Sequence, residues 1–348
     1  MLRFNKIAIL IVLAVSLSHA LSARADANPQ FIADERSALE RLLNGHKVIN
    51  IVDDFLAFWD VAKSKTPFVQ RRLWMRMVES KYRDYFDRAV YRDATPRERR
   101  AMLREFLIRV PSQVEAIREL NKTIYNNIIQ AFINFKHVRF AEYTQQNDIY
   151  IGLSLFRFDG AVRAVQNDAG IPDTLCLGME ALSTYSPEQV RIAITHEFFH
   201  LYHFSFLFRN PSLADFRAPH MPLIIEGMAV AGTEECYPFL PRSLYLHFTD
   251  EEIATQQRDL SVSAARFLEL VKTEAPPESY EQWFTNNATD EAPSRGGYLL
   301  GYEVAKRVLA DYTLEEMVRM SPAELRALVE QHLNAIAGNG VLILASTN

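Results

Sequence analysis

The sequence predicts an α+β protein that is mainly helical, and three observations support this. Amphipathic helical patterns run from residue 34 to about 135 and return from residue 187 onward. Between them lie short segments rich in β-branched and aromatic residues that partly alternate in polarity. The chain has 348 residues, 49% of them hydrophobic, so it can bury the core of one large domain or two smaller ones.

The first 25 residues have the features of an export signal. Two basic residues precede the apolar run Ile7–Leu17, and small residues follow it up to Ala25. We expect cleavage after Ala25, with cleavage after Ala20 as the alternative. Because the run is too short to span a bilayer comfortably, we expect a periplasmic or secreted protein with no stable membrane insertion after cleavage.

The charge balance argues against a nucleic-acid partner. Removal of residues 1–25 deletes three basic and no acidic residues, which takes the formal net charge from -5 to -8. A basic segment at residues 71–109 is interleaved with acidic residues, a mixture typical of a solvated helical face. Cys176 and Cys236 are the two cysteines, and the sequence leaves open a disulfide between them or two buried thiols.

Several expected helix starts carry a serine or threonine followed three residues later by glutamate or glutamine, and the two side chains cap free backbone amides. A helical N-terminal region should occupy residues 26–135. Later helices are expected at residues 187–206, 222–234, 250–273, 297–311 and 322–337. The residues that start these motifs are Thr95, Ser112, Ser186, Thr249, Thr313 and Ser321.

A small sheet, rich in antiparallel pairs, is expected between the two helical parts. Its candidate strands are residues 137–143, 148–158, 161–166 and 173–179. Asp159 and Gly160 form a hairpin signal between the second and third segments.

The sequence THEFFH predicts a metal site on the helix at residues 187–206. His196 and His200 lie four positions apart, so both imidazoles can point at one ion. Glu197 lies about 100° further around the helix, which suits a base for a metal-activated water. The rest of this helix is apolar on nearly every side, and buried histidine and glutamate side chains are costly without partners.

A catalytic zinc needs three protein ligands, so a third must come from elsewhere. Glu226 is the only charged residue in the apolar run of residues 221–231, and a carboxylate there requires a partner. We therefore predict His196, His200 and Glu226 as the zinc ligands. Glu234 and Glu235 follow that run and fit its solvated end, while His203 fits a core histidine better than a ligand.

The HEFFH motif followed by the EGMA helix resembles the gluzincin branch of the zincin metallopeptidases. The longer spacing to Glu226 and the segment GGYLLGYEVAKRVL from Gly296 are similar to uncharacterised predicted zinc-dependent proteases. The resemblance implies a zincin-like metallopeptidase domain, placed here at residues 136–348, with two zinc-bearing helices. It also implies that the segment at residue 148 or at residue 173 is the sheet edge that aligns an extended peptide.

The resemblance implies hydrolysis of a peptide or protein substrate, with Glu197 as general base. Tyr298 is the first candidate for the donor that stabilises the oxyanion, with Tyr302 and His220 behind it. Two alternatives stay open at this point. One is an inactive zincin-like binding or structural module, and the other is a zinc hydrolase that acts on a non-peptide amide or ester.

Overall fold

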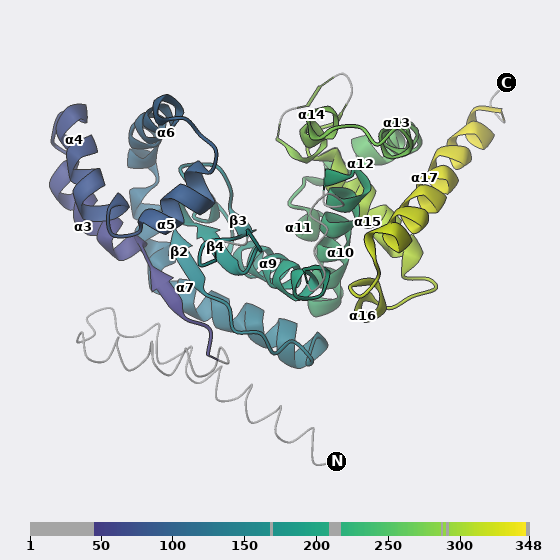
Figure 1. Ribbon diagram of the computed structural model, residues 1–348, viewed down its shortest axis with the longest axis horizontal. Helices are drawn as coiled ribbons and strands as arrows, with labels where there is room; N and C mark the ends of the chain where they lie inside the picture. Colours follow the sequence, from purple (N-terminus) through teal and green to yellow (C-terminus); the bar gives the residue numbers. More distant parts are fainter. Residues whose placement is uncertain (1–44, 168–169, 209–216, 287, 290–291, 346–348) are drawn as a thin grey trace, which may run out of the picture. The chain divides into compact units, whose positions relative to one another are not determined.

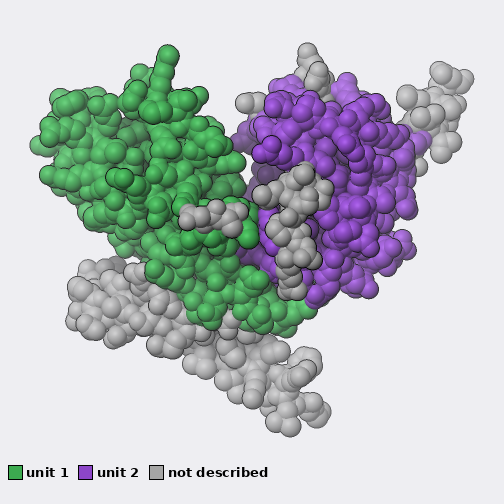
Figure 2. Space-filling view, viewed as in Figure 1, with its two compact units in different colours: residues 1–194 green, residues 195–348 purple. Residues whose placement is uncertain are grey.

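The computed structural model describes residues 45–345, apart from residues 168–169, 209–216, 287 and 290–291 (Figure 1). The predicted export signal lies outside the described residues. The chain forms two compact units, Met1–Ile194 and Thr195–Asn348, which Figure 2 colours separately. In the described part of the chain, none of the helices is long and apolar enough to cross a membrane. The fold is α+β and mainly helical, as predicted.

Unit 1 contains a four-stranded mixed sheet with the strand order β1-β2-β4-β3. Its strands are β1 (Val48–Asn50), β2 (Ile149–Gly152), β3 (Gly160–Arg163) and β4 (Thr174–Gly178). β2 pairs in parallel with β1 and with β4, and only β3 and β4 are antiparallel. The expectation of an antiparallel-rich sheet is therefore wrong. The two predicted peptide-aligning edges are also wrong, because β2 and β4 are the inner strands and β1 and β3 are the edges.

The loop at residues 153–159 explains why β3 does not form a hairpin with β2. This loop crosses the carboxyl end of β4, where a Cβ atom on Gly178 would come within 2.1 Å of the Phe158 carbonyl oxygen. The amide of Gly178 donates to the Asp159 carbonyl at 2.7 Å. The chain therefore reaches the far side of β4 before β3 begins, and Asp159-Gly160 starts an outer strand instead of a tight turn.

Two further differences from the predicted sheet concern a strand that was expected but does not form and a strand that was not expected. The segment 137–143 is not a strand, since a π-helical turn continues to Arg139 and a turn follows. There Phe135, Phe140 and Tyr143 form a buried aromatic cluster that favours the helical path. β1 lies inside the region expected to be all helical. It pairs with residues about 100 positions later, so local pattern does not reveal it.

Helices surround the sheet of unit 1, and their aromatic side chains form its core. Trp74 is fully buried and its ring packs against those of Phe55, Phe58 and Phe106. These rings bring α3, α4 and α6 together around one cluster. The helical segments are α3 (Val52–Ala62), α4 (Pro67–Trp74), η1 (Met75–Glu79), α5 (Arg83–Tyr85), η2 (Phe86–Tyr91), α6 (Pro96–Arg109), η3 (Val110–Ser112), α7 (Val114–Phe132), η4 (Ile133–Arg139) and α8 (Met179–Leu182).

The helix α9 (Pro187–Leu207) contains the boundary between the units, and unit 2 is helical in its described part. One expected helix, at residues 250–273, is interrupted at Asp259, whose backbone leaves the helical conformation. The helices of unit 2 are α10 (His220–Cys236), α11 (Arg242–Leu246), α12 (Asp250–Arg258), α13 (Leu260–Lys272), α14 (Pro277–Tyr280), η6 (Glu281–Phe284), α15 (Gly296–Val308), α16 (Leu314–Met317) and α17 (Pro322–Ala345).

The capping motifs locate most of the predicted helix starts. At each correct position, the side-chain oxygen accepts from the amide three residues on, and that residue's side chain accepts from the cap amide. Ser112 is the exception, because its hydroxyl donates to the Arg109 carbonyl and the next helix begins at Val114. The confirmed caps are Thr95, Ser186, Thr249, Thr313 and Ser321.

Candidate metal centre

The helix α9 is a buried helix, as its apolar sequence predicts. Ser186 caps its start, and its apolar residues, including Ile192, Ile194, Phe198 and Phe199, have no exposed surface. Polar side chains on such a helix lose their water and must find partners inside the protein.

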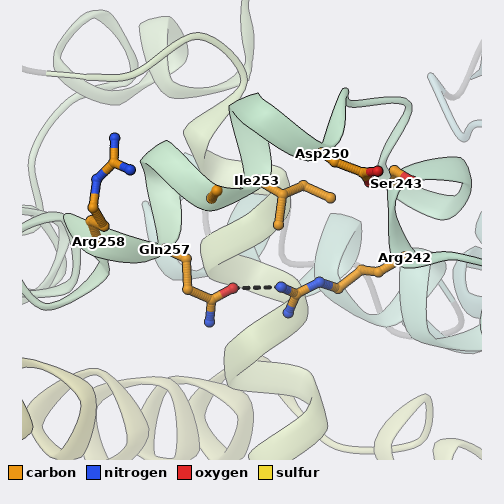
Figure 3. Close-up of a pocket in the computed structure, with 7 residues that line it drawn as sticks. Arg242, Ser243, Asp250, Ile253, Gln257 and Arg258 are labelled. Atoms are coloured by element: carbon orange, nitrogen blue, oxygen red, sulfur yellow. Dashed lines mark hydrogen bonds between the residues drawn. The ribbon is translucent and has the colours of Figure 1, made fainter.

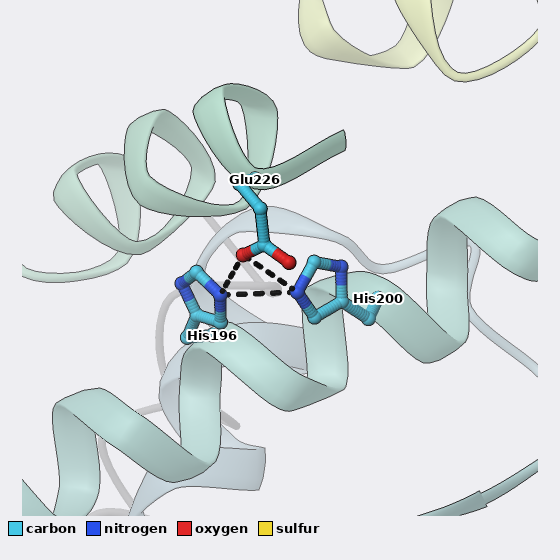
Figure 4. Close-up of side chains that lie close together, drawn as sticks. All are labelled: His196, His200 and Glu226. Atoms are coloured by element: carbon cyan, nitrogen blue, oxygen red, sulfur yellow. Dashed lines mark hydrogen bonds and ion pairs between the residues drawn. The ribbon is translucent and has the colours of Figure 1, made fainter. Parts of the chain in front are cut away.

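His196 and His200 of α9 meet Glu226 of α10, as Figure 4 shows. The Nε2 atoms of the two histidines are 3.0 Å apart. The Oε2 atom of Glu226 lies 3.1 Å from Nε2 of His196 and 3.4 Å from Nε2 of His200. The structure thus brings together the three predicted ligands, although they come from two helices.

The spacing of these three atoms fits a tetrahedral zinc ion. Nitrogen and oxygen ligands lie about 2.0–2.1 Å from zinc, so two ligands of a tetrahedral site are about 3.3 Å apart. The three separations observed here bracket that value. Two neutral imidazoles and one carboxylate are also a ligand set that zinc takes in catalytic sites. The donor atoms therefore fit a zinc ion by geometry and by chemistry.

The environment of Glu226 keeps its carboxylate ionised. Burial by itself would raise the pKa of Glu226, but the electrostatic interaction with His200 and hydrogen bonds from both histidines lower that pKa below its usual value. The side chain of Glu226 is 22% exposed, compared with 14% for His196 and 7% for His200. A charged ligand with partial access to solvent suits a site that keeps one position open for substrate.

Glu197 lies next to His196 in sequence but outside the group of three donors. Only 7% of its surface is exposed. Glu197 is not one of the three donors, and its role as general base stays a prediction from the sequence.

A close contact between α10 and α15 brings further side chains toward this group. A Cβ atom on Gly227 would lie 2.1 Å from the Gly301 carbonyl oxygen, so the two backbones touch. One turn before Gly301, the ring of Tyr298 lies 6.5 Å from the ring of His196. The first-choice donor therefore lies beside one of the predicted ligands.

Two residues that contact Tyr298 were not predicted from the sequence. The guanidinium of Arg295 lies 4.5 Å from the centre of the Tyr298 ring, and Phe284 packs edge-on at 6.0 Å. The spacing of Arg295 and Tyr298, three residues apart at a helix start, was the available signal for the first contact. Phe284 comes from another element, so the sequence holds no comparable signal for it.

The two lower-ranked donor candidates are engaged elsewhere. The Tyr302 hydroxyl donates to Glu234 at 3.0 Å, and Lys306 binds the same carboxylate oxygen at 2.8 Å. Burial, and then the negative charge of Glu234, raise the pKa of Tyr302. Nε2 of His220 lies 3.1 Å from the Pro322 carbonyl oxygen, at the start of α17.

The remaining sequence candidates lie outside the group as well. His203 is fully buried, and burial, followed by the electrostatic interaction with His200, lowers its pKa to about 3. It packs against Phe199 and Phe204 and is not among the three donors. Cys176 and Cys236 are both buried free thiols.

A surface cavity of about 560 Å³ lies along α11 and α12 (Figure 3). Arg242 and Gln257 face each other across it, and none of its lining residues belongs to the metal group. Arg242 is already paired with Glu303 at 2.7 Å, so its charge is largely satisfied within the protein. The cavity therefore supplies no ligand to the metal group.

Comparison with known proteins identifies one family. Neither the curated proteins nor the solved structures include a match to the chain. Residues 130–327, more than half of the chain, match a family described as predicted Zn-dependent protease. The matched part includes α9, α10 and α15, which contain the donor group and Tyr298. The chain therefore belongs to the family of predicted Zn-dependent proteases (DUF2268).

Proposed function

We propose that this protein is a zinc metallopeptidase of the gluzincin type, with His196, His200 and Glu226 as the zinc ligands. The observation that carries the proposal is the spacing of the three donor atoms, 3.0, 3.1 and 3.4 Å, across two helices. Membership in a family of predicted zinc-dependent proteases supports the same reaction class. The zincin-like core at residues 136–348, preceded by a helical region, remains part of this proposal.

Glu197 is the general base in this proposal. When bound, zinc lowers the pKa of water toward 7 and polarises a carbonyl group. The Glu197 carboxylate takes a proton from the attacking water and delivers it to the nitrogen of the leaving amine. Its burial limits competing hydrogen bonds with bulk solvent.

Tyr298 is the proposed donor to the developing oxyanion. Its ring lies beside His196, and the Arg295 guanidinium over that ring holds it in place. Tyr302 would first have to give up its hydrogen bond to Glu234. The structure thus favours the first candidate over the second.

The proposed substrates are peptides or proteins, and the proposed location is the periplasm or the outside of the cell. The export signal predicted for residues 1–25 supports the location. The predicted absence of a nucleic-acid partner remains an expectation from the net charge.

The decisive experiment measures metal content and hydrolysis together in the purified protein. We expect one zinc per chain in the wild type and in Glu197→Gln, but weakened zinc binding in His200→Ala and Glu226→Ala. Hydrolysis of a fluorogenic unfolded protein should fall about 10²- to 10⁴-fold in Glu197→Gln, since it loses only the proton acceptor. The two ligand variants should be inactive.

Glu235→Gln is the matched control, because it removes an acidic group from the same helix as Glu226. It should keep both zinc and activity. Zinc with no hydrolysis in the wild type would favour an inactive module, and turnover of small amides or esters but not peptides would favour a non-peptide substrate. Zinc retained in full by Glu226→Ala would contradict the ligand set.

The roles of Tyr298 and Tyr302 can be distinguished by variants that each lack one of the two hydroxyl groups. Tyr298→Phe should lower kcat about 100-fold with little change in KM, because the lost hydrogen bond acts mainly in the transition state. Tyr302→Phe should leave kcat nearly unchanged and lower the free energy of unfolding by about 1 kcal/mol. The reverse pattern of kcat values would assign the donor role to Tyr302.

A further inference from the structure

The helical run formed by α4 and η1 exposes an unusual set of side chains in unit 1. One side of this run is buried, since Trp74 and Val78 have no exposed surface. The opposite side carries large apolar and basic residues at positions i, i+3, i+4, i+7 and i+8, which share one face of a helix. We call this the α4 stripe, and it consists of Phe68, Arg71, Arg72, Met75 and Arg76.

The α4 stripe is locally basic in a chain that is acidic overall. Residues 62–78 contain five basic and no acidic residues, although the formal net charge of the chain is -5. Among the described residues, no carboxylate pairs with the three arginines of the stripe, and Lys63 approaches Asp60 only at 3.8 Å. These charges therefore remain available to an anionic partner.

The apolar side chains of the α4 stripe are largely exposed to water, which does not stabilise a monomer. Phe68 is 60% exposed and Met75 is 44% exposed. Val61, near the end of the neighbouring helix α3, is 49% exposed. The guanidinium groups of Arg71 and Arg72 each lie 5.9 Å from the centre of the Phe68 ring, so cations flank the exposed aromatic side chain.

We propose that the α4 stripe binds the surface of membranes that contain anionic lipids. An interfacial helix places large apolar side chains among the acyl chains and arginines among the headgroup phosphates, which is the combination observed here. Met75 of the stripe and Val61 of the neighbouring helix α3 have no planar face for stacking on nucleic-acid bases, so the composition favours lipid over nucleic acid. The stripe precedes residue 130, where the family match begins.

Vesicle binding tests this proposal. The chain from Asp26 onward should be used, since the apolar run Ile7–Leu17 would itself bind lipid. We expect it to sediment with vesicles of phosphatidylcholine and phosphatidylglycerol but not with phosphatidylcholine alone. Arg71→Gln/Arg72→Gln/Arg76→Gln should lower the partition coefficient roughly 100-fold, at about fivefold for each arginine. Raising the salt to about 1 M, where the Debye length falls to about 3 Å, should have a similar effect.

The apolar part of the α4 stripe requires a separate variant. Phe68→Ala/Met75→Ala keeps every charge, and it should lower the partition coefficient about tenfold if the side chains enter the bilayer. Circular dichroism should show that both stripe variants keep the wild-type helix content, because the changed side chains are exposed.

A charge-matched control removes three exposed basic residues from unit 2. Arg258→Gln/Arg266→Gln/Lys272→Gln should bind vesicles as the wild type does. Equal loss in this control, or wild-type binding by Phe68→Ala/Met75→Ala, would overturn the proposal. Tighter binding to a DNA oligonucleotide than to anionic vesicles would overturn it in favour of a nucleic-acid surface.

Discussion

At the scale of single residues, His46 shows how burial controls a protonation state. It has no exposed surface, and its Nδ1 atom lies 2.8 Å from the Asn147 carbonyl oxygen and 3.0 Å from the Asn147 amide. Burial lowers the pKa of His46 from 6.5 to about 4, although the hydrogen bond with Asn147 acts in the opposite direction. The folded protein therefore holds this side chain neutral under mildly acidic conditions.

The free energy of unfolding should depend on pH through His46. Above pH 6.5 the side chain is neutral in both states, and it contributes no dependence. Between pH 6.5 and about 4 the unfolded chain binds a proton that the folded chain does not, so stability should fall by about 3 kcal/mol across this window. Denaturant unfolding at several pH values measures this loss.

The control for this prediction is His46→Gln, which keeps a polar side chain but cannot titrate. Its free energy of unfolding should be lower at pH 7 and should fall less between pH 6.5 and 4 than in the wild type. An identical slope in both proteins would show that other groups cause the acid sensitivity.

At the scale of elements, the contact between α10, which carries Glu226, and α15, which carries Tyr298, positions two parts of the candidate site. Gly227 follows Glu226 directly, and its Cβ position would fall 2.1 Å from the backbone of Gly301. A Cβ atom on Gly301 would in turn lie 2.2 Å from the Leu223 carbonyl oxygen. Backbone atoms cannot rotate away as side chains can, so any larger residue must push the helices apart.

Gly301→Ala should therefore destabilise the protein and weaken zinc binding without touching a ligand. We expect a loss of about 3 kcal/mol in the free energy of unfolding, together with a lower zinc affinity as α10 shifts. Thermal unfolding and zinc titration measure the two effects.

Gly338→Ala provides the matched control in α17, because its added Cβ meets no atom within 4 Å. Removing a glycine from an open helical position should stabilise the protein by up to about 1 kcal/mol. A harmless Gly301→Ala variant would mean that the two helices have room to separate.

At the scale of the whole molecule, zinc should couple the two helices of the candidate site to overall stability. A ligand that binds only the folded state stabilises it by about 4 kcal/mol at a free concentration of about 1,000 times Kd. For a protein of this size we expect zinc to raise Tm by roughly 6 °C over the chelated protein.

The Glu226→Ala variant separates this effect from weak binding of zinc elsewhere on the surface. Its Tm should respond little to added zinc, because one of the three donors is missing. Equal shifts in the wild type and the variant would place the responsible ion outside the candidate site. Scanning calorimetry with zinc and with a chelator gives both values.

Several features follow from the sequence alone because they depend on neighbours within one or two helical turns. The capping residues at Thr95, Thr249 and Thr313 are confirmed, since a cap is a contact between residues three apart. The pairing of His196 with His200 is equally local, because residues four apart share a helix face. Glu226 was predicted on energetic grounds, as the one charge in an apolar run, and the structure places its carboxylate at both imidazoles.

Only the tertiary structure decided which distant segments meet. The parallel pairing of β1 with β2 joins residues 101 positions apart, and the order β2-β4-β3 depends on a loop that crosses Gly178. The proposal of Tyr298 over Tyr302 as the oxyanion donor likewise rests on a tertiary contact, the hydrogen bond from Tyr302 to Glu234 in another helix. Burial and packing between elements set these arrangements. Short-range sequence patterns do not reveal the free energy of packing between distant segments.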